Sequence, residues 1–186
     1  EIPSSVTSIG YDAFSGCSNL TSIIVDVNNP IYDSRNDCNA IVETSTNTLI
    51  VGCQNTVIPN TLTRLADYAS SYCRNLTSIE IPSSVTSIGE YAFYECSSLT
   101  NIYFKGTIED WCKVKFTSET SQPKYYASNV FMLNENDEYY EFEELVSVGA
   151  ISLIKAVDTY NPDRNIKFIT YATKCIYNGL FIYMRT

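Results

Sequence analysis

Apolar residues recur at fixed offsets along the chain, and polar residues separate them. Residues 81–102 hold this set of apolar positions: Ile81, Val85, Ile88, Ala92, Phe93, Cys96, Leu99 and Ile102. Residues 2–23 repeat the same order, and residues 58–79 form a weaker copy. The last two copies start at Ile58 and Ile81, which sets a period of 23 residues. A fixed period of this length predicts a solenoid, because one coil cannot bury its own apolar residues and stacked coils bury them together.

Each copy contains the patterns of short extended segments. Residues 99–104 alternate and are rich in β-branched and aromatic side chains, which predicts a short strand. Residues 85–88 predict a second extended stretch. Residues 90–95 predict one helical turn that directs Ala92 and Phe93 into the core.

Residues 24–57 stand between two matching copies as an insert of 34 residues. Residues 40–51 predict a hairpin, with two apolar strands on either side of Thr44–Asn47. The insert either enlarges a binding surface or is a repeat variant that adds a hairpin. Its carboxylates, Asp26, Asp33, Asp37 and Glu43, lie among polar turn residues, which favours a solvated loop over a catalytic pair or a calcium site.

Two copies follow the motif Ile-Pro-x-x-Val-Thr-x-Ile-x-x-x-Ala-Phe-x-x-Cys-x-x-Leu-Thr-x-Ile almost fully. The motif resembles the leucine-rich repeats of the BspA-like family, which occurs in bacterial surface proteins and in some protists. The resemblance covers about residues 1–130. It implies an α+β fold, built as a right-handed leucine-rich-repeat solenoid with short parallel strands on one face. It also implies a non-enzymatic module that binds a protein or glycan partner on the solenoid face.

Residues 104–144 change in character. Thr107 and Asp110 have the spacing of a capping box, which predicts a short helix. Trp111 either closes the end of the solenoid core or serves as a ligand platform. Residues 134–144 are strongly acidic, and no basic residue occurs between Lys124 and Lys155. These shifts predict a solenoid at 1–133, an acidic linker at 134–142 and a further unit at 143–186.

The last unit has the periodicity of two helices. Residues 143–158 carry one apolar face at helical spacing, and Asn161-Pro162 ends it. Residues 166–184 predict a second helix. The pair predicts a C-terminal α-helical hairpin.

The hairpin also carries a second resemblance. Ser-Leu-Ile-Lys-Ala-Val-Asp-Thr-Tyr-Asn-Pro (152–162) and Ile-Lys-Phe-Ile-Thr-Tyr-Ala (166–172) resemble region 2 of sigma-70-family sigma factors, closest to the sporulation type. The resemblance implies core RNA polymerase binding by a set in the first helix: Glu144, Leu145, Gly149, Leu153 and Ala156. It implies binding of single-stranded −10 promoter DNA by a set in the second helix: Lys167, Phe168, Thr170, Tyr171, Lys174 and Asn178. Stacking of bases on aromatic rings and pairing of lysines with phosphates suit that role. The alternative is that Phe168 and Tyr171 pack against the first helix.

Composition narrows the chemistry. The net charge of −9 disfavours nonspecific attraction of the whole chain to nucleic acid or to an acidic membrane surface. The absence of histidine removes the commonest general base and metal ligand. No GxGxxG, P-loop or GxSxG motif occurs, and no apolar run is long enough to span a bilayer. We therefore expect no catalysis, metal, cofactor or membrane insertion.

The seven cysteines predict thiols rather than a disulfide framework, because their number is odd and no CxxC pair occurs. Cys17, Cys73 and Cys96 occupy one slot of the repeat and are expected in the core. A Cys38–Cys53 bridge is the alternative for two of the others.

Two hypotheses of function result. The first is an interaction module for a protein or glycan, at the cell surface if the chain behaves as a typical BspA-like protein. The second is a transcription-linked partial sigma factor, which would be cytoplasmic.

Overall fold

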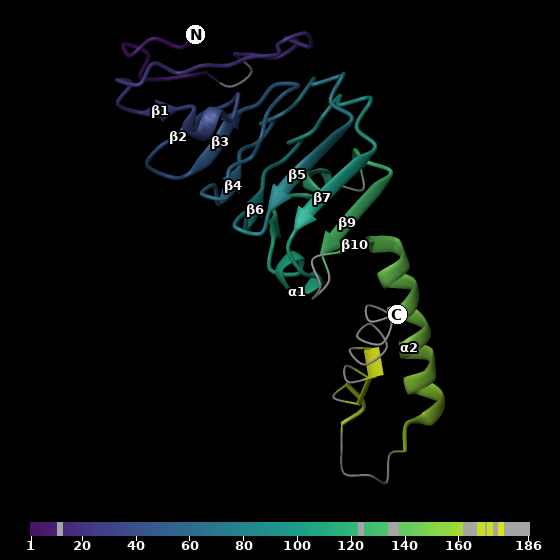
Figure 1. Cartoon of the computed structure of the whole chain (residues 1–186). Coiled ribbons are helices and arrows are strands. Elements are labelled where there is room, and N and C mark those ends of the chain that lie inside the picture. Colours follow the sequence, from purple (N-terminus) through teal and green to yellow (C-terminus); the bar gives the residue numbers. More distant parts are fainter. Residues whose placement is uncertain are drawn as a thin grey trace.

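The structure is a computed structural model that describes residues 1–10, 13–122, 125–133, 138–161, 167–169, 171–172 and 175–176, with the backbone alone for 142–145. Successive coils lie side by side, and the N-terminus and the long helix α2 (Phe142–Thr159) lie at opposite ends of the stack (Figure 1). The fold is α+β, with mixed sheets built by the repeats.

Two sheets run along the stack. The first has the order β1 (Tyr32–Asp33), β2 (Ile41–Glu43), β3 (Thr48–Val51), β4 (Arg64–Leu65), β6 (Ser87–Ile88), β8 (Lys115–Phe116). The second has the order β10 (Tyr139–Glu141), β9 (Asn129–Leu133), β7 (Asn101–Lys105), β5 (Ser78–Pro82). Strands of different coils pair in parallel, whereas β1–β2–β3 and β9–β10 are antiparallel.

The strand registers place matching repeat positions beside one another. Leu65 pairs with Ile88, and Ile79 pairs with Ile102. All four side chains are buried, because alternate residues of a strand point to the same face and here that face meets the core. Gly89 allows the close approach of two coils, since a Cβ at this position would meet the backbone of Ala66 and Asp67 at 2.5 Å.

The turn at residues 90–95 is not helical, so the expected helical turn is wrong. Tyr91 and Glu95 have φ values of 53° and 58°, which lie in the left-handed region. In the preceding coil, the N–H groups of Tyr68, Ser70 and Tyr72 donate to the carbonyls of Glu90, Ala92 and Tyr94 at 2.9, 2.7 and 2.6 Å. Hydrogen bonds between coils thus satisfy backbone groups that a helix would satisfy internally. The inward direction of Ala92 and Phe93 is confirmed, because both are fully buried.

The insert extends the first sheet. β2 and β3 form the hairpin that the sequence predicts, with residues 44–47 as its turn. β1 adds to one side of this hairpin, and β4 of the next coil pairs with β3. A 3-10 helix, η1 (Arg35–Asp37), connects β1 to β2.

The far end of the stack contains the predicted short helix α1 (Ile108–Trp111), and Thr107 and Asp110 form its capping box. Trp111 is buried, with its ring centroid 5.0 Å from that of Phe104 and 5.4 Å from that of Phe116. This position agrees with a ring that closes the core. A second 3-10 helix, η2 (Glu119–Ser121), follows β8.

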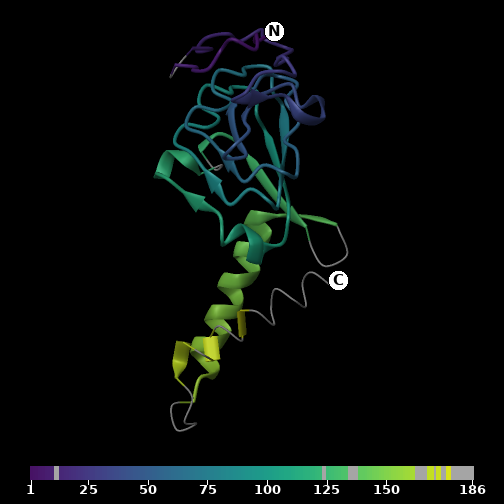
Figure 2. The ribbon, with the colours of Figure 1, turned by 90° about the vertical axis from the view of Figure 1, so that its left-hand side faces the viewer.

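The helix predicted at residues 143–158 is confirmed as α2, which contacts β9 and β10 and projects away from the coils (Figure 2). β10 lies within the range expected as a linker. The described positions at 168, 169, 171, 172, 175 and 176 are helical, and the rest of the predicted second helix lies outside the described residues. In the described part of the chain, no helix combines the length and apolar character needed to cross a membrane.

Candidate functional site

The buried residues of the coils divide into two core clusters. One cluster holds Ile23, Val25, Tyr32, Ile41 and Cys53, and the half-buried Ile9, Phe14 and Leu20 of the first coil pack against it. The other runs through the later coils. The insert separates the first coil from the coil that begins at Ile58, so the core of the repeat is not continuous at this place.

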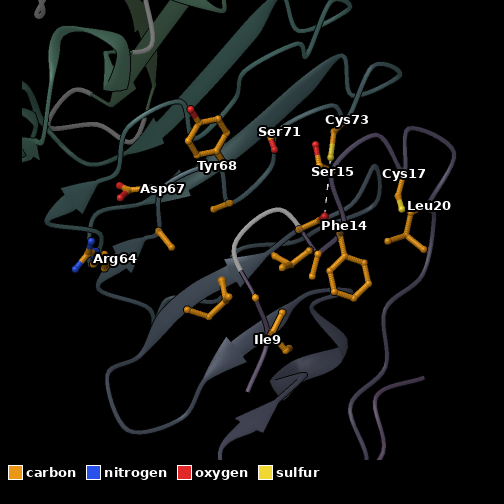
Figure 3. Close-up of a pocket in the computed structure, with 17 residues that line it drawn as sticks. Ile9, Phe14, Ser15, Cys17, Leu20, Arg64, Asp67, Tyr68, Ser71 and Cys73 are labelled. Carbon is orange, nitrogen blue, oxygen red and sulfur yellow. Dashed lines mark hydrogen bonds between the residues drawn. The ribbon is translucent and has the colours of Figure 1, made fainter. Parts of the chain in front are cut away.

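A cleft of about 290 Å³ lies at this discontinuity (Figure 3). Ile9, Phe14 and Leu20 line it from the first coil. Gly52, Ala69 and Cys73 line it from the insert and the next coil. Its polar residues include Arg64, Asp67, Tyr68 and Ser71. The cleft therefore combines apolar walls with a few polar groups, which is the usual make-up of a ligand pocket.

Hydrogen bonds hold the two walls together near the turn that follows β3. The backbone N–H of Gln54 donates to the carbonyl of Leu20 at 3.2 Å, and its side-chain amide donates to the carbonyl of Ser18. The side-chain amide of Asn55 donates to the carbonyl of Thr21 at 3.2 Å. These contacts join the first coil to the insert beside the cleft.

The cysteines correct one expectation from the repeat. Cys73 and Cys96 are buried, but Cys17 is exposed and lines the cleft. Cys17 differs because it lies in the first coil, outside the core of the later coils, whereas Cys73 and Cys96 belong to that core even though Cys73 also borders the cleft. Cys38 and Cys53 are free thiols, so the alternative bridge is not formed. The hydrogen bond with Cys96 and burial raise the pKa of the Cys73 thiol, and burial raises the pKa of the Cys38 and Cys53 thiols, so these groups stay protonated at neutral pH.

Among the carboxylates of the insert, Asp33 has a structural role, because it forms an ion pair and a hydrogen bond within the insert. Asp33 pairs with Arg35 at 2.6 Å and accepts a hydrogen bond from the Thr44 hydroxyl at 2.7 Å. Burial alone would raise the pKa of Asp33, but the hydrogen bonds from Arg35 and Thr44 outweigh it and the pKa is lowered. Among the residues that the structure describes, no group of three or more potential ligands could hold a metal ion.

A second pocket, of about 330 Å³, adjoins the cleft. It is lined by Ser15, Tyr68, Tyr72, Tyr91 and Tyr94, of which Ser15 and Tyr68 also line the cleft. Sequence reasoning missed this tyrosine pocket. The signal was present, because Tyr68 and Tyr91 occupy one slot in successive copies. Apolar periodicity does not detect it, because the tyrosines lie between the core positions.

The residues implied for polymerase binding do not share one exposed face of α2. Leu153 is 41% exposed, whereas Ala156 is fully buried. A Cβ on Gly149 would lie 3.8 Å from Cγ2 of Ile176, so Gly149 faces the second helical segment. Glu144 and Leu145 lie in the first turns of α2, and their side chains are outside the description.

The residues implied for DNA binding lie near the C-terminal end of α2 where they are described. Lys167 is exposed. Phe168 and Tyr171 place their ring centroids 5.1 and 5.8 Å from that of Tyr160, so both rings contact the residue that follows α2. The Tyr171 and Thr159 hydroxyl oxygens are 3.0 Å apart. Thr170, Lys174 and Asn178 lie outside the described residues.

Curated relatives match a short part of the chain. A sigma-E factor of Clostridium acetobutylicum is 51% identical over 43 residues, which are 23% of this chain and 18% of that protein. A sigma-28 factor of Bacillus thuringiensis subsp. kurstaki is 42% identical over 43 residues, with the same shares of 23% and 18%. The chain thus spans less than a fifth of the length of these relatives.

Solved structures and a family model match the repeats. A leucine-rich repeat protein from Eubacterium ventriosum is 26% identical with a TM-score of 0.36, over 56% of this chain and 35% of that one. A leucine rich cell surface protein from Faecalibacterium prausnitzii is 23% identical with a TM-score of 0.32, over 63% of this chain and 50% of that one. The family model of the BspA type leucine rich repeat region matches residues 1–38 and 48–160 in six copies. With its apolar periodicity, paired coils and this match over most of its length, the chain belongs to the BspA-type leucine-rich repeat family.

Proposed function

We propose that this chain is a non-enzymatic interaction module that binds a protein or glycan partner with the surface of its coils. In this proposal its coils form a right-handed solenoid of 23-residue period over residues 1–133, and a helical hairpin at 143–186 follows the acidic segment 134–142, which contains β10. The family supports the general role, since repeat proteins of this kind use extended surfaces for binding.

The cleft between the first coil and the coil from Ile58 is the observation that carries the proposal. The core residues described in the later coils are buried, but here Ile9, Phe14 and Leu20 remain half-buried beside an open cavity. Burial of such side chains by a partner releases water from apolar surface and stabilises a complex. The described lining of the cleft offers apolar side chains with a few polar groups, which are suited to binding.

A variant whose side chain blocks the cleft tests whether the cleft is the binding site. Ala13 is exposed and lines the cleft, so Ala13→Trp would occupy the cavity without replacing a core side chain. Wild type and variant are applied to immobilised extracellular-matrix proteins and polysaccharides, and bound protein is measured over a concentration series. We expect Ala13→Trp to weaken binding by about tenfold or more, equivalent to about 1.4 kcal/mol.

Ala150→Trp is the matched control, because it adds the same ring at an exposed position of α2. Circular dichroism checks that both variants fold. Equal binding by Ala13→Trp and the wild type would overturn the cleft as the binding site, and lost binding by Ala150→Trp would move the site to α2.

A second candidate function is favoured by the sigma-factor relatives and by α2 itself. Ile151, Ile154 and Val157 of α2 are 53%, 61% and 60% exposed, so among the described residues this helix presents apolar surface. We propose as the alternative that the hairpin binds core RNA polymerase, −10 promoter DNA, or both, as a partial sigma factor.

Purified core RNA polymerase tests the alternative. Leu153→Asp places a charge at the exposed apolar surface of α2, and Leu153→Met, the matched control, keeps an apolar side chain at the same position. Circular dichroism checks that both variants fold. Saturable binding that Leu153→Asp loses and Leu153→Met keeps would establish the alternative. A lack of binding at micromolar concentration would leave the hairpin as part of the repeat module.

A further inference from the structure

Four tyrosines from two successive coils form one aromatic cluster. Tyr68 and Tyr72 come from the coil of residues 58–80, and Tyr91 and Tyr94 come from the next coil. The ring centroid of Tyr94 lies 6.4, 5.7 and 5.4 Å from those of Tyr68, Tyr72 and Tyr91, each in an edge-on arrangement. The centroids of Tyr68 and Tyr91 are 5.1 Å apart. These separations are typical of attractive ring pairs, so the rings hold one another in place.

The choice of tyrosine at these positions is costly for the backbone. Tyr68, Tyr72 and Tyr91 have φ values of 56°, 62° and 53°, where a side chain with a Cβ is disfavoured. The other described residues with a positive φ are Asn, Asp or Gly, with the exception of Glu95 beside the same cluster. In the first copy of the repeat, the slots of Tyr68 and Tyr72 hold Asp12 and Gly16. The turn therefore does not require tyrosine, and bulky residues in strained backbone tend to mark functional sites.

Charged groups around the cluster are mainly acidic. Glu95 pairs with Arg74 at 3.4 Å, and the Arg74 guanidinium lies 5.9 Å from the centroid of the Tyr72 ring. Asp67 accepts a hydrogen bond from the backbone N–H of Glu90 at 2.8 Å, and the Thr120 hydroxyl donates to the Glu90 carboxylate at 3.3 Å. Arg74 is thus balanced by Glu95, and Asp67 and Glu90 add negative charge. This field disfavours an anionic ligand.

From these observations we propose that the tyrosine pocket, lined by Ser15, Tyr68, Tyr72, Tyr91 and Tyr94, binds a neutral saccharide. This inference rests on the proposed interaction function and gives it a ligand class. The C–H face of a pyranose packs on an aromatic ring, and phenol hydroxyls exchange hydrogen bonds with sugar hydroxyls. Tyrosine offers both in one rigid side chain. The cavity of about 330 Å³ is at the lower end of the range for small-ligand sites, and suits one or two sugar rings.

A cationic peptide is the competing ligand, since carboxylates and ring faces also attract cations. The Arg74 guanidinium already lies over the Tyr72 ring, so that ring face is taken and a cationic side chain would have to displace it, whereas an uncharged ligand can use the other rings.

Isothermal titration calorimetry of the full chain tests the proposal with six probes. The neutral probes are cellotetraose, xylotetraose, mannotetraose and galactotetraose. Tetragalacturonate is the anionic probe and tetra-arginine the cationic one. Tyr94→Ala removes the most exposed ring of the four, and Tyr94→Phe keeps the ring without its hydroxyl. Tyr125→Ala is the matched control, because it removes an exposed tyrosine outside the pocket.

We expect at least one neutral probe to bind the wild type and the Tyr125→Ala variant alike. Tyr94→Ala is expected to weaken that binding by about tenfold or more, and Tyr94→Phe by less. The proposal is overturned if no neutral probe binds at millimolar concentration, if tetra-arginine or tetragalacturonate binds instead, or if Tyr94→Ala leaves the affinity unchanged.

The Ala13→Trp variant distinguishes a failure of the saccharide-pocket proposal from a failure of the proposed interaction function. Partner binding that depends on Ala13 while Tyr94→Ala has no effect would overturn the saccharide pocket and leave the interaction module standing. Insensitivity to both variants would overturn both.

Discussion

At the scale of single residues, the turns of the coils show how the backbone constrains the side chain. Glu95 has a φ of 58° and its slot is filled by Gly16, with a φ of 75°, in the first coil. Glu95 gains an ion pair with Arg74 there, but both side chains are about half exposed, and such pairs contribute little. The residue that suits the backbone best at this slot is therefore glycine.

Glu95→Gly is expected to raise the free energy of unfolding by up to about 1 kcal/mol. Relief of the left-handed conformation is worth about 1–2 kcal/mol, and the extra freedom of glycine in the unfolded chain removes about 0.5–1 kcal/mol of it. Urea unfolding measures the change. Glu95→Ala is the control, because it removes the ion pair and keeps the Cβ. A loss of stability in Glu95→Gly equal to that in Glu95→Ala would show that the backbone carries no strain.

Tyr126 provides a prediction on pH. Burial, with the neighbouring Tyr91 and Tyr68, raises the pKa of Tyr126 to about 12, and its hydroxyl donates to the carbonyl of Thr120. The unfolded chain loses this proton near pH 10. The stability that depends on the neutral phenol is therefore fully present below about pH 10 and is lost as the pH rises through about 12.

The measurement compares wild type with Tyr126→Phe in urea unfolding at about pH 9 and about pH 11.5, which lie on either side of the tyrosine pKa of about 10 in the unfolded chain. The wild type should lose stability relative to the variant between the two pH values. Titrating groups that both proteins share affect both free energies of unfolding equally, so their contribution cancels in the comparison. A difference in free energy of unfolding that is the same at both pH values would contradict the raised pKa.

At the scale of elements, sequence patterns predict well where the interactions are local. Residues 40–51 predict the β2–β3 hairpin, and Thr107 with Asp110 predicts the capping box of α1. The turn at 90–95 was not predictable in this way, because hydrogen bonds to the neighbouring coil decide its form. The exposure of Cys17 depends likewise on the insert that opens the cleft. The tyrosine pocket depends on two coils meeting in space.

Gly149→Ala tests the packing of α2 against the second helical segment. The new Cβ would lie 3.8 Å from Ile176, an ordinary contact, so the better helix propensity of Ala should stabilise α2 by about 0.8–1 kcal/mol. Amide hydrogen exchange in α2 should slow by about fivefold. Ala150→Gly, at an exposed position of the same helix, should accelerate it. Faster exchange in Gly149→Ala would show that the two helical segments pack too closely for a methyl group.

At the scale of the whole molecule, the chain has a repeat body with two core clusters and a helix that projects from its end. The cleft is lined by the first coil and the coil that begins at Ile58. The helix α2 lies at the end of the stack opposite the first coil (Figure 1). The two candidate functions therefore use separate surfaces, and a footprint of the bound partner distinguishes them.

That footprint is the measurement we would make first: hydrogen–deuterium exchange of the full chain, alone and saturated with the immobilised protein or polysaccharide that binds it best. The interaction-module account predicts slower exchange in the peptides that carry the cleft residues Phe14, Leu20, Tyr68 and Cys73, with α2 unchanged. Slower exchange confined to residues 146–159 would contradict the account and assign binding to the helical hairpin.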